Sequence, residues 1–205
     1  MTLLQYYRGF GSLYGAFAAI PFLPPLVHIL TPDSNRLASL YPPLGDIQIL
    51  GLAATFLVLI GVTFAVFASC QSARRVHPAV TPASIVGTVL GFFLLIGMYE
   101  FFVRDIVVPS VNQEVLVSIG YQRTDFALRT YPTSNDRDML HDQGPSEETV
   151  QLLWTRSSIW IVRGILWLLY TVTLACFLVV ICVGVYQHAS DVSPAESKVL
   201  KPQAK

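Results

Sequence analysis

The sequence predicts an all-α membrane protein: a bundle of four transmembrane helices with a small extracytoplasmic loop domain between the third and fourth helices. The composition is 53% hydrophobic and only 13% charged, with a mean hydropathy of +0.56. Soluble domains carry roughly 25% charged residues, so this composition is typical of a membrane protein. A helix needs about 20 apolar residues to cross a bilayer. Segments that meet this requirement lie at 9–30, 47–69, 83–103 and 159–186.

The first segment, residues 9–30, is interpreted as a transmembrane helix with a kink in its second half. Pro21, Pro24 and Pro25 lack the N–H group that continues a helix, which membrane helices tolerate where neighbours satisfy the freed carbonyls. A secretory signal peptide is the alternative, because Ala16-Phe17-Ala18 resembles a small-residue cleavage site. The apolar run continues well beyond that site, which favours the transmembrane helix.

Small residues recur at four-residue spacing in the apolar segments. Such residues let helix backbones approach closely inside a membrane. We therefore expect Gly11, Gly15 and Ala19 of the first helix, and Gly87 and Gly91 of the third, to lie at helix–helix contacts. Contacts within one bundle and contacts with another subunit both use such residues, and we favour the first.

The distribution of basic residues predicts that both termini are cytoplasmic. All three lysines lie in residues 190–205, and Arg74 and Arg75 lie in the short connection between the second and third segments. Short connections and tails are the best evidence for the positive-inside rule. Residues 1–189 are then one multi-pass membrane domain with an extracytoplasmic loop at 104–158, and residues 190–205 form a short disordered cytoplasmic tail.

The extracytoplasmic loop is predicted to contain a β-hairpin, a polar loop and the start of the last helix. Runs of β-favouring residues flank Gly120–Thr124, which is typical of a hairpin. The polar stretch TSNDRDMLHDQGP, residues 133–145, indicates an exposed loop. Pro145 and the acidic residues after it are typical of a helix start, and nothing before Trp160 predicts an interruption. We therefore expect one helix to continue from here into the fourth segment.

Two charged residues interrupt the apolar segments near their outer ends. Arg163 lies in the fourth segment, and Glu100 is the only acidic residue within the four segments. A charge at the centre of a bilayer costs about 2.5–3.5 kcal/mol on insertion scales, so it is usually paired or directed toward the headgroups. Because the third and fourth helices are antiparallel and the two residues lie at similar depth, we predict a Glu100–Arg163 ion pair. Arg104, Asp105 and Arg156 are expected to extend it into a network.

Residues that would indicate catalysis, a metal site or a cofactor are sparse. The densest polar cluster contains Asp136, Asp138, His141 and Asp142, but it fails the calcium-loop pattern because Leu140 replaces an oxygen ligand. No phosphate-binding glycine motif occurs. Acidic and basic residues number 13 each, which gives no sign of a nucleic-acid surface. We therefore expect no enzymatic activity, no cofactor, no metal and no nucleic-acid partner.

Two classes of function remain. The first is a non-catalytic accessory or scaffold subunit of a larger membrane assembly, whose partners are the lipid bilayer and other membrane-protein subunits. The second is a homo-oligomeric ion channel or pore. A pore-lining helix carries polar residues along its length, whereas the fourth segment has little beyond Thr171 and Thr173 below Arg163. This difference favours the accessory subunit.

Overall fold

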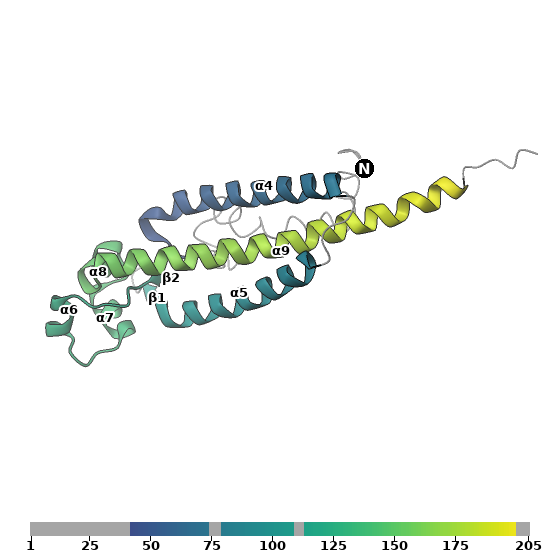
Figure 1. Ribbon diagram of the computed structural model, residues 1–205. Helices are drawn as coiled ribbons and strands as arrows, with labels where there is room; N and C mark the ends of the chain where they lie inside the picture. Colours follow the sequence, from purple (N-terminus) through teal and green to yellow (C-terminus); the bar gives the residue numbers. More distant parts are fainter. Residues whose placement is uncertain (1–41, 74–78, 109–112, 200–205) are drawn as a thin grey trace, which may run out of the picture. The chain divides into compact units, whose positions relative to one another are not determined.

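The structure is a computed structural model that describes residues 42–73, 79–108 and 113–199 (Figure 1). Most of these residues are helical, and one pair of short strands interrupts the helices. In chain order the elements are η3 (Gly45–Ile47), α4 (Gln48–Ala73), α5 (Val80–Phe102), β1 (Val103–Val108), β2 (Gln113–Ser118), α6 (Asp125–Thr130), α7 (Asp136–Gln143), α8 (Glu147–Leu153) and α9 (Arg156–Val199).

Three of the helices are long and apolar enough to cross a membrane. The apolar stretches are Gln48–Val66 in α4, the whole of α5, and Arg156–Gly184 in α9. They correspond to the second, third and fourth apolar segments of the sequence, in agreement with an integral membrane protein. A bundle of four helices stays a prediction. The first segment (9–30) and its predicted packing residues Gly11, Gly15 and Ala19 lie outside the described residues.

The described residues divide into two compact units. The boundary falls within each of the three long helices, and in each unit α9 contacts both α4 and α5. One unit includes the two strands and the helices α6 to α8 and is called the head unit; it contains residues 42–55, 90–108 and 113–172. The other, called the helical unit, contains residues 56–73, 79–89 and 173–199.

In the helical unit, α9 packs against both of the other long helices. Leu59 of α4 is buried in an apolar cluster with Leu178 and Cys182 of α9. α5 approaches α9 at Gly87, where an added Cβ would lie 3.0 Å from Sγ of Cys176. A small residue at this position lets the two helices come this close without displacing the Cys176 side chain.

Helix α9 is the longest element, with 44 residues. Its apolar part, Arg156–Gly184, has 29 residues, which exceeds the about 20 that a bilayer requires. The helix continues to Val199, so helical backbone extends into the segment 190–205 for which we expected a disordered tail. Residues 200–205 lie outside the described residues.

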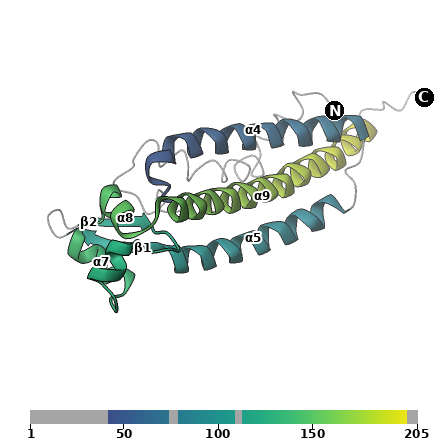
Figure 2. The same cartoon turned by 60° about the vertical axis from the view of Figure 1, so that its left-hand side comes forward.

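Residues 103–108 and 113–155, called the head, form a small folded domain at the start of α9 (Figures 1 and 2). Strands β1 and β2 pair antiparallel, with Val103 opposite Ser118. Helices α6, α7 and α8 follow the hairpin, and one apolar core joins them to it and to α9. The buried members of this core are Ile106, Val117, Ile119, Ala127, Met139, Leu140, Val150, Leu153, Trp154 and Ile159.

The hairpin is not the one that we predicted. Strands were expected on both sides of Gly120–Thr124, but β1 begins directly after α5, and the residues after Thr124 form α6. The hydroxyl of Thr124 accepts a hydrogen bond from the N–H of Ala127 at 3.2 Å and so caps the helix. Asp125 in the first turn and Arg129 in the last turn both suit the helix dipole. These local interactions favour the helix over a second strand.

The polar stretch 133–145, expected to be an exposed loop, contains helix α7. The side chain of Asn135 caps it by accepting a hydrogen bond from the N–H of Asp138 at 2.8 Å, and Gly144 follows it with a φ of +89°. Met139 and Leu140 are fully buried in the head core. The prediction failed because these two apolar residues were counted as part of a polar loop.

The last helix is interrupted where we expected a continuous one. Helix α8 ends at Leu153, and Trp154 has an extended backbone. The N–H of Thr155 donates to the carbonyl of Gln122 at 2.9 Å, and the N–H of Thr124 donates to the carbonyl of Leu153 at 3.0 Å. Because backbone groups at the break bond to another segment, they are not available for helical hydrogen bonds. The break is therefore fixed by contacts that are distant in sequence.

Candidate functional site

Arg163 is a buried cation near the start of α9, the last candidate membrane-spanning helix. It lies about two turns into α9, and its side chain is 5% exposed. A charge in such a position needs hydrogen-bond partners, because an unpaired buried charge costs several kcal/mol. All three nitrogen atoms of the guanidinium group donate to side chains of two other elements.

Glu147, the first residue of α8, is the ion-pair partner of Arg163. Its two carboxylate oxygens accept hydrogen bonds from Nη1 and Nη2, each at 2.7 Å. This bidentate arrangement is among the strongest that arginine forms. Nε donates to the hydroxyl of Ser118, the last residue of β2, at 2.9 Å. The guanidinium group thus joins α9 to α8 and to the hairpin of the head.

The turn before α4 closes over the Arg163–Glu147 pair. At Gly45, an added Cβ would lie 2.5 Å from Nη1 of Arg163 and 2.5 Å from Oε2 of Glu147. The φ of Gly45 is +57°, a conformation that favours glycine. Gly45 is therefore suited to this position both by its backbone and by its lack of a side chain. Leu44 beside it is fully buried.

The predicted Glu100–Arg163 ion pair is wrong, because Arg163 pairs with Glu147. Glu147 and Arg163 are 16 residues apart, and a continuous helix would separate them by about 24 Å along its axis. The break at Trp154 instead brings α8 back beside α9. Arg156, which we expected in the same network, is exposed at the first residue of α9. It is not among the residues that bond to Arg163.

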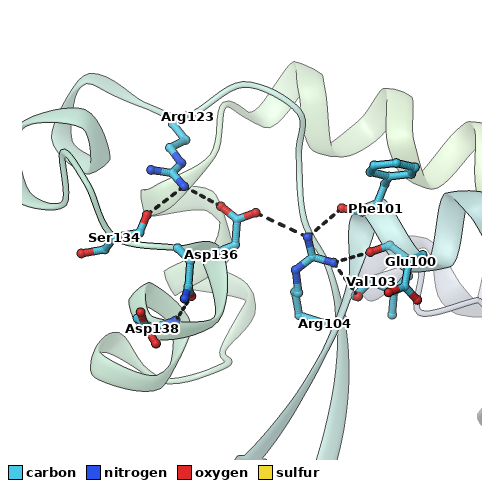
Figure 3. Close-up of polar contacts among 9 residues, drawn as sticks. Glu100, Phe101, Val103, Arg104, Arg123, Ser134, Asp136 and Asp138 are labelled. Atoms are coloured by element: carbon cyan, nitrogen blue, oxygen red, sulfur yellow. Dashed lines mark hydrogen bonds and ion pairs between the residues drawn. The ribbon is translucent and has the colours of Figure 1, made fainter.

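Arg104 belongs to a second charged cluster at the C-terminal end of α5 (Figure 3). Nη1 donates to the carbonyl of Glu100 at 2.7 Å and of Val103 at 3.1 Å, and Nη2 donates to the carbonyl of Phe101 at 3.0 Å. The last carbonyls of a helix lack partners within it, and a cation there also suits the helix dipole. Nη2 lies 3.6 Å from Asp136 of α7. Arg104 therefore caps α5 and contacts the head.

Two further ion pairs attach the segment around α7 to neighbouring parts of the head. Nη2 of Arg123 donates to the Asp136 carboxylate at 2.9 Å and to the carbonyl of Ser134 at 3.1 Å (Figure 3). Arg137 of α7 pairs with Asp105 of β1. The hydrogen bond from Arg137 holds the pKa of Asp105 below its usual range. Asp105 is thus in a charged network, as expected, but in one that contains Arg137 and not Arg163.

The charged residues at the end of α5 line a surface pocket of about 480 Å³. One wall consists of Glu100 and residues 103–105, and the other consists of residues 135–137 of the α7 segment. The lining therefore combines three carboxylates with two guanidinium groups. The pocket lies where the apolar helix α5 ends, which is also the end of a candidate membrane-spanning stretch.

The pKa of Glu147 lies below its usual range. Burial of the carboxyl group raises this pKa, but the hydrogen bonds from Arg163 and its positive charge outweigh burial. Gln151, one turn further along α8, donates another hydrogen bond to the carboxylate at 3.2 Å. The carboxyl group of Glu147 is therefore ionised at neutral pH.

A polar contact joins α4 to α9 within the head unit. The Nε1–H of Trp167 lies 3.1 Å from the carbonyl of Gly51 and 3.1 Å from the hydroxyl of Thr55. The Thr55 hydroxyl also lies 3.2 Å from that of Thr171, and both threonines are buried. Thr171, which we considered as a polar residue of a pore-lining face, instead takes part in a helix–helix contact. Gly91 of α5, a predicted packing residue, is half-buried in the same unit.

Within residues 42–73, 79–108 and 113–199, no three His, Cys, Asp or Glu side chains are grouped so that they could hold a metal ion. No known protein family matches the sequence, and no curated protein or solved structure is significantly similar to it.

Proposed function

We propose that the protein is a non-catalytic subunit of a larger membrane assembly and that its head is the docking element. The observation that supports this most is that the buried charge of Arg163 is bonded to side chains of the head. Arg163 directs its donors to Glu147 and Ser118, and Gly45 closes over the pair. The charge therefore fixes the head to a membrane helix, which is what a subunit needs if it is to present a folded surface in a constant orientation.

The surface of the head also supports a docking role. Four large apolar side chains of the head, Tyr121, Phe126, Leu128 and Leu152, are between 41% and 57% exposed. The hydroxyl of Thr124 donates to the carbonyl of Leu152 at 2.6 Å, so the start of α6 lies beside the end of α8. Aromatic and large apolar residues are enriched in surfaces that contact other proteins.

The alternative function, a homo-oligomeric channel, requires a polar path through the membrane helices. In the described parts of α4 and α5, the hydroxyls of Thr55, Thr63 and Thr88 donate to carbonyls of their own helices. Such bonds satisfy the hydroxyl within the helix and do not need water. This favours the accessory subunit.

Native mass spectrometry of the protein, extracted from its own membrane in nanodiscs, tests the proposal. We expect the 22.6 kDa chain in a stoichiometric complex with at least one different polypeptide. The double variant Tyr121→Ser with Phe126→Ser is expected to lose that polypeptide while the thermal stability of the head is retained. Glu148→Ser, a change at another exposed position of the head, should keep it.

Two results would contradict the proposal. A single species whose mass is a multiple of 22.6 kDa, without any other chain, would instead support the homo-oligomeric channel. Equal binding of the second polypeptide by the double variant and by Glu148→Ser would show that the apolar surface of the head is not the docking element.

A further inference from the structure

We propose that the pocket at the end of α5 binds the headgroup of a phospholipid with a primary ammonium group, the phosphatidylethanolamine class. The first argument is the position of the pocket. Helix α5 is long and apolar enough to cross a membrane from Val80 to Phe102, and none of its described residues is buried. Its last turn therefore lies at the boundary between hydrocarbon and headgroups. Glu100 of that turn lines the pocket, which places the pocket at the depth of lipid headgroups.

The second argument is the charge of the lining. Three carboxylates and two guanidinium groups give the lining a formal sum of −1, and Arg123, which pairs with Asp136 from outside the lining, brings the whole cluster to zero. An anionic headgroup would leave this cluster with a net negative charge, whereas a zwitterionic headgroup adds none. A zwitterion also presents one group for each sign: a phosphate for the arginines and a cation for the carboxylates. The lining therefore favours a zwitterionic phospholipid.

The third argument concerns Glu100 itself. The other two carboxylates of the lining are paired, Asp105 with Arg137 and Asp136 with Arg104. Glu100 is exposed and forms no ion pair among the described residues. A carboxylate at the edge of the hydrocarbon is costly unless a cation meets it. A primary ammonium group offers three N–H donors, and a quaternary ammonium group offers none, so Glu100 selects ethanolamine over choline.

The two arginines of the pocket have different roles in binding the headgroup. The donors of Arg104 are directed to the carbonyls at the end of α5, so this residue contributes mainly positive charge (Figure 3). Arg137 is largely exposed and pairs with Asp105 through Nη2, which leaves other donors of the same guanidinium group for a phosphate. Arg137 is therefore the residue that we expect to bind the lipid phosphate.

The helix below the pocket provides a surface for the acyl chains. Ile96 and Phe93 precede Glu100 by four and seven residues, so they lie on the same face of α5. Both are exposed, Phe93 by 67%, and so is Phe101 beside Glu100. A lipid whose headgroup occupies the pocket can therefore extend its chains along an apolar face that the described residues leave uncovered.

The test is lipid retention by the full-length protein. The protein is reconstituted with equal amounts of phosphatidylethanolamine, phosphatidylcholine and phosphatidylglycerol of the same acyl chains, returned to detergent, and analysed by native mass spectrometry. We expect wild type to retain phosphatidylethanolamine in preference to the other two. Glu100→Gln should weaken its retention about tenfold, the effect of one charge-assisted hydrogen bond, and abolish the preference over phosphatidylcholine. Arg137→Gln should lower the retention of both phosphatidylethanolamine and phosphatidylcholine.

Matched variants separate binding from folding. Glu148→Gln and Arg129→Gln alter exposed residues of the head outside the pocket and should retain lipid as wild type does. Glu100→Lys changes the sum of the lining from −1 to +1, because it replaces a carboxylate with an ammonium group. This variant should gain a preference for phosphatidylglycerol, a result that a misfolded pocket would not give.

Three results would overturn the proposal. One is equal retention of phosphatidylethanolamine by Glu100→Gln and Glu148→Gln. Another is a preference of wild type for phosphatidylglycerol. The third concerns the source of the headgroup: if free phosphoethanolamine displaces the retained lipid and raises the Tm as much as the lipid does, the pocket binds a soluble compound and not a membrane lipid.

Discussion

The two residues that fix the head differ in their access to water. The side chain of Arg163 is 5% exposed, and that of Glu147 is 29% exposed. If Arg163 is removed, the Glu147 carboxylate can be rehydrated in place. If Glu147 is removed, the guanidinium group is left buried with only the Ser118 hydroxyl as acceptor. Loss of the acid therefore leaves the more costly unpaired charge.

A double-mutant cycle tests this pair. We expect Glu147→Gln to lower the free energy of unfolding by about 3–5 kcal/mol, and Arg163→Met to lower it by about 1–3 kcal/mol. The double variant should lose less unfolding free energy than the sum of the two single losses, because it no longer contains the buried guanidinium group. Unfolding of the detergent-solubilised protein measures these losses. As a control, Glu100→Gln combined with Arg163→Met should give additive losses. Additive losses for the Glu147 cycle would contradict the ion pair.

The lowered pKa of Glu147 makes the stability of the head depend on pH. The folded state holds this carboxyl group below its usual pKa of 4.5, so the unfolded state binds more protons in acid. The stabilisation is complete above the unfolded pKa and is lost as the pH falls through the folded pKa. We expect the Tm of the wild type to fall between about pH 5 and pH 3, and that of Glu147→Gln to fall less over the same range.

The acidic residue Asp105 acts in the same direction, since its pKa is also lowered. The fall in Tm that remains in Glu147→Gln is therefore expected to decrease further when Asp105→Asn is added. If the Tm of Glu147→Gln falls in acid as much as that of wild type, the ionised carboxyl group of Glu147 is not stabilised by Arg163.

At the scale of elements, the hydroxyl of Thr55 joins α4 to α9 through Trp167 and Thr171. Thr55→Val keeps the shape of the side chain and removes this hydroxyl, so we expect a loss of about 0.6–1.7 kcal/mol of stability. Thr63→Val is the control, because the hydroxyl of Thr63 bonds to the carbonyl of Leu59 in its own helix. The loss of stability caused by Thr63→Val should be close to zero. Equal losses for the two variants, measured by unfolding in detergent, would contradict an interhelical contact.

The long helices could be predicted from the sequence because each one is determined by its own apolar run. The predicted segments 47–69 and 83–103 correspond to Gln48–Ala73 and Val80–Phe102. The helices α6 and α7 could also have been predicted, since their capping residues, Thr124 and Asn135, lie directly before them in the sequence. They were missed because the β-favouring and polar character of these segments was weighted above the capping signals.

The partner of Arg163 could not be predicted from local sequence. It depends on the break between α8 and α9, where Thr155 bonds to Gln122 and no proline or glycine marks the interruption. Ser118 and Gly45 reach the same guanidinium group from elements that are far away in the chain. The residues of the site were visible in the sequence, but their assembly is a property of the tertiary structure.

At the scale of the whole molecule, the number of membrane crossings determines which parts share a side. The head lies between α5 and α9 in the chain, so it is separated from the C-terminal end of α9 by one crossing if α9 spans the membrane. If residues 9–30 also cross the membrane, the N-terminus and the C-terminus are on the same side. If those residues do not cross, the N-terminus shares the side of the head.

Cysteine labelling in sealed vesicles distinguishes these arrangements. Single cysteines are placed by Thr2→Cys, Arg129→Cys and Ser197→Cys in a protein without its native cysteines. A maleimide that does not cross membranes is then added before or after detergent. We expect the cysteines at positions 2 and 197 to react from one side and the cysteine at 129 from the other, because four helices return the chain to its starting side. Reaction at position 2 together with 129 would show three crossings. Loss of the position-2 label from the mature chain would instead identify residues 9–30 as a cleaved signal peptide, since cleavage removes the labelled residue with the segment.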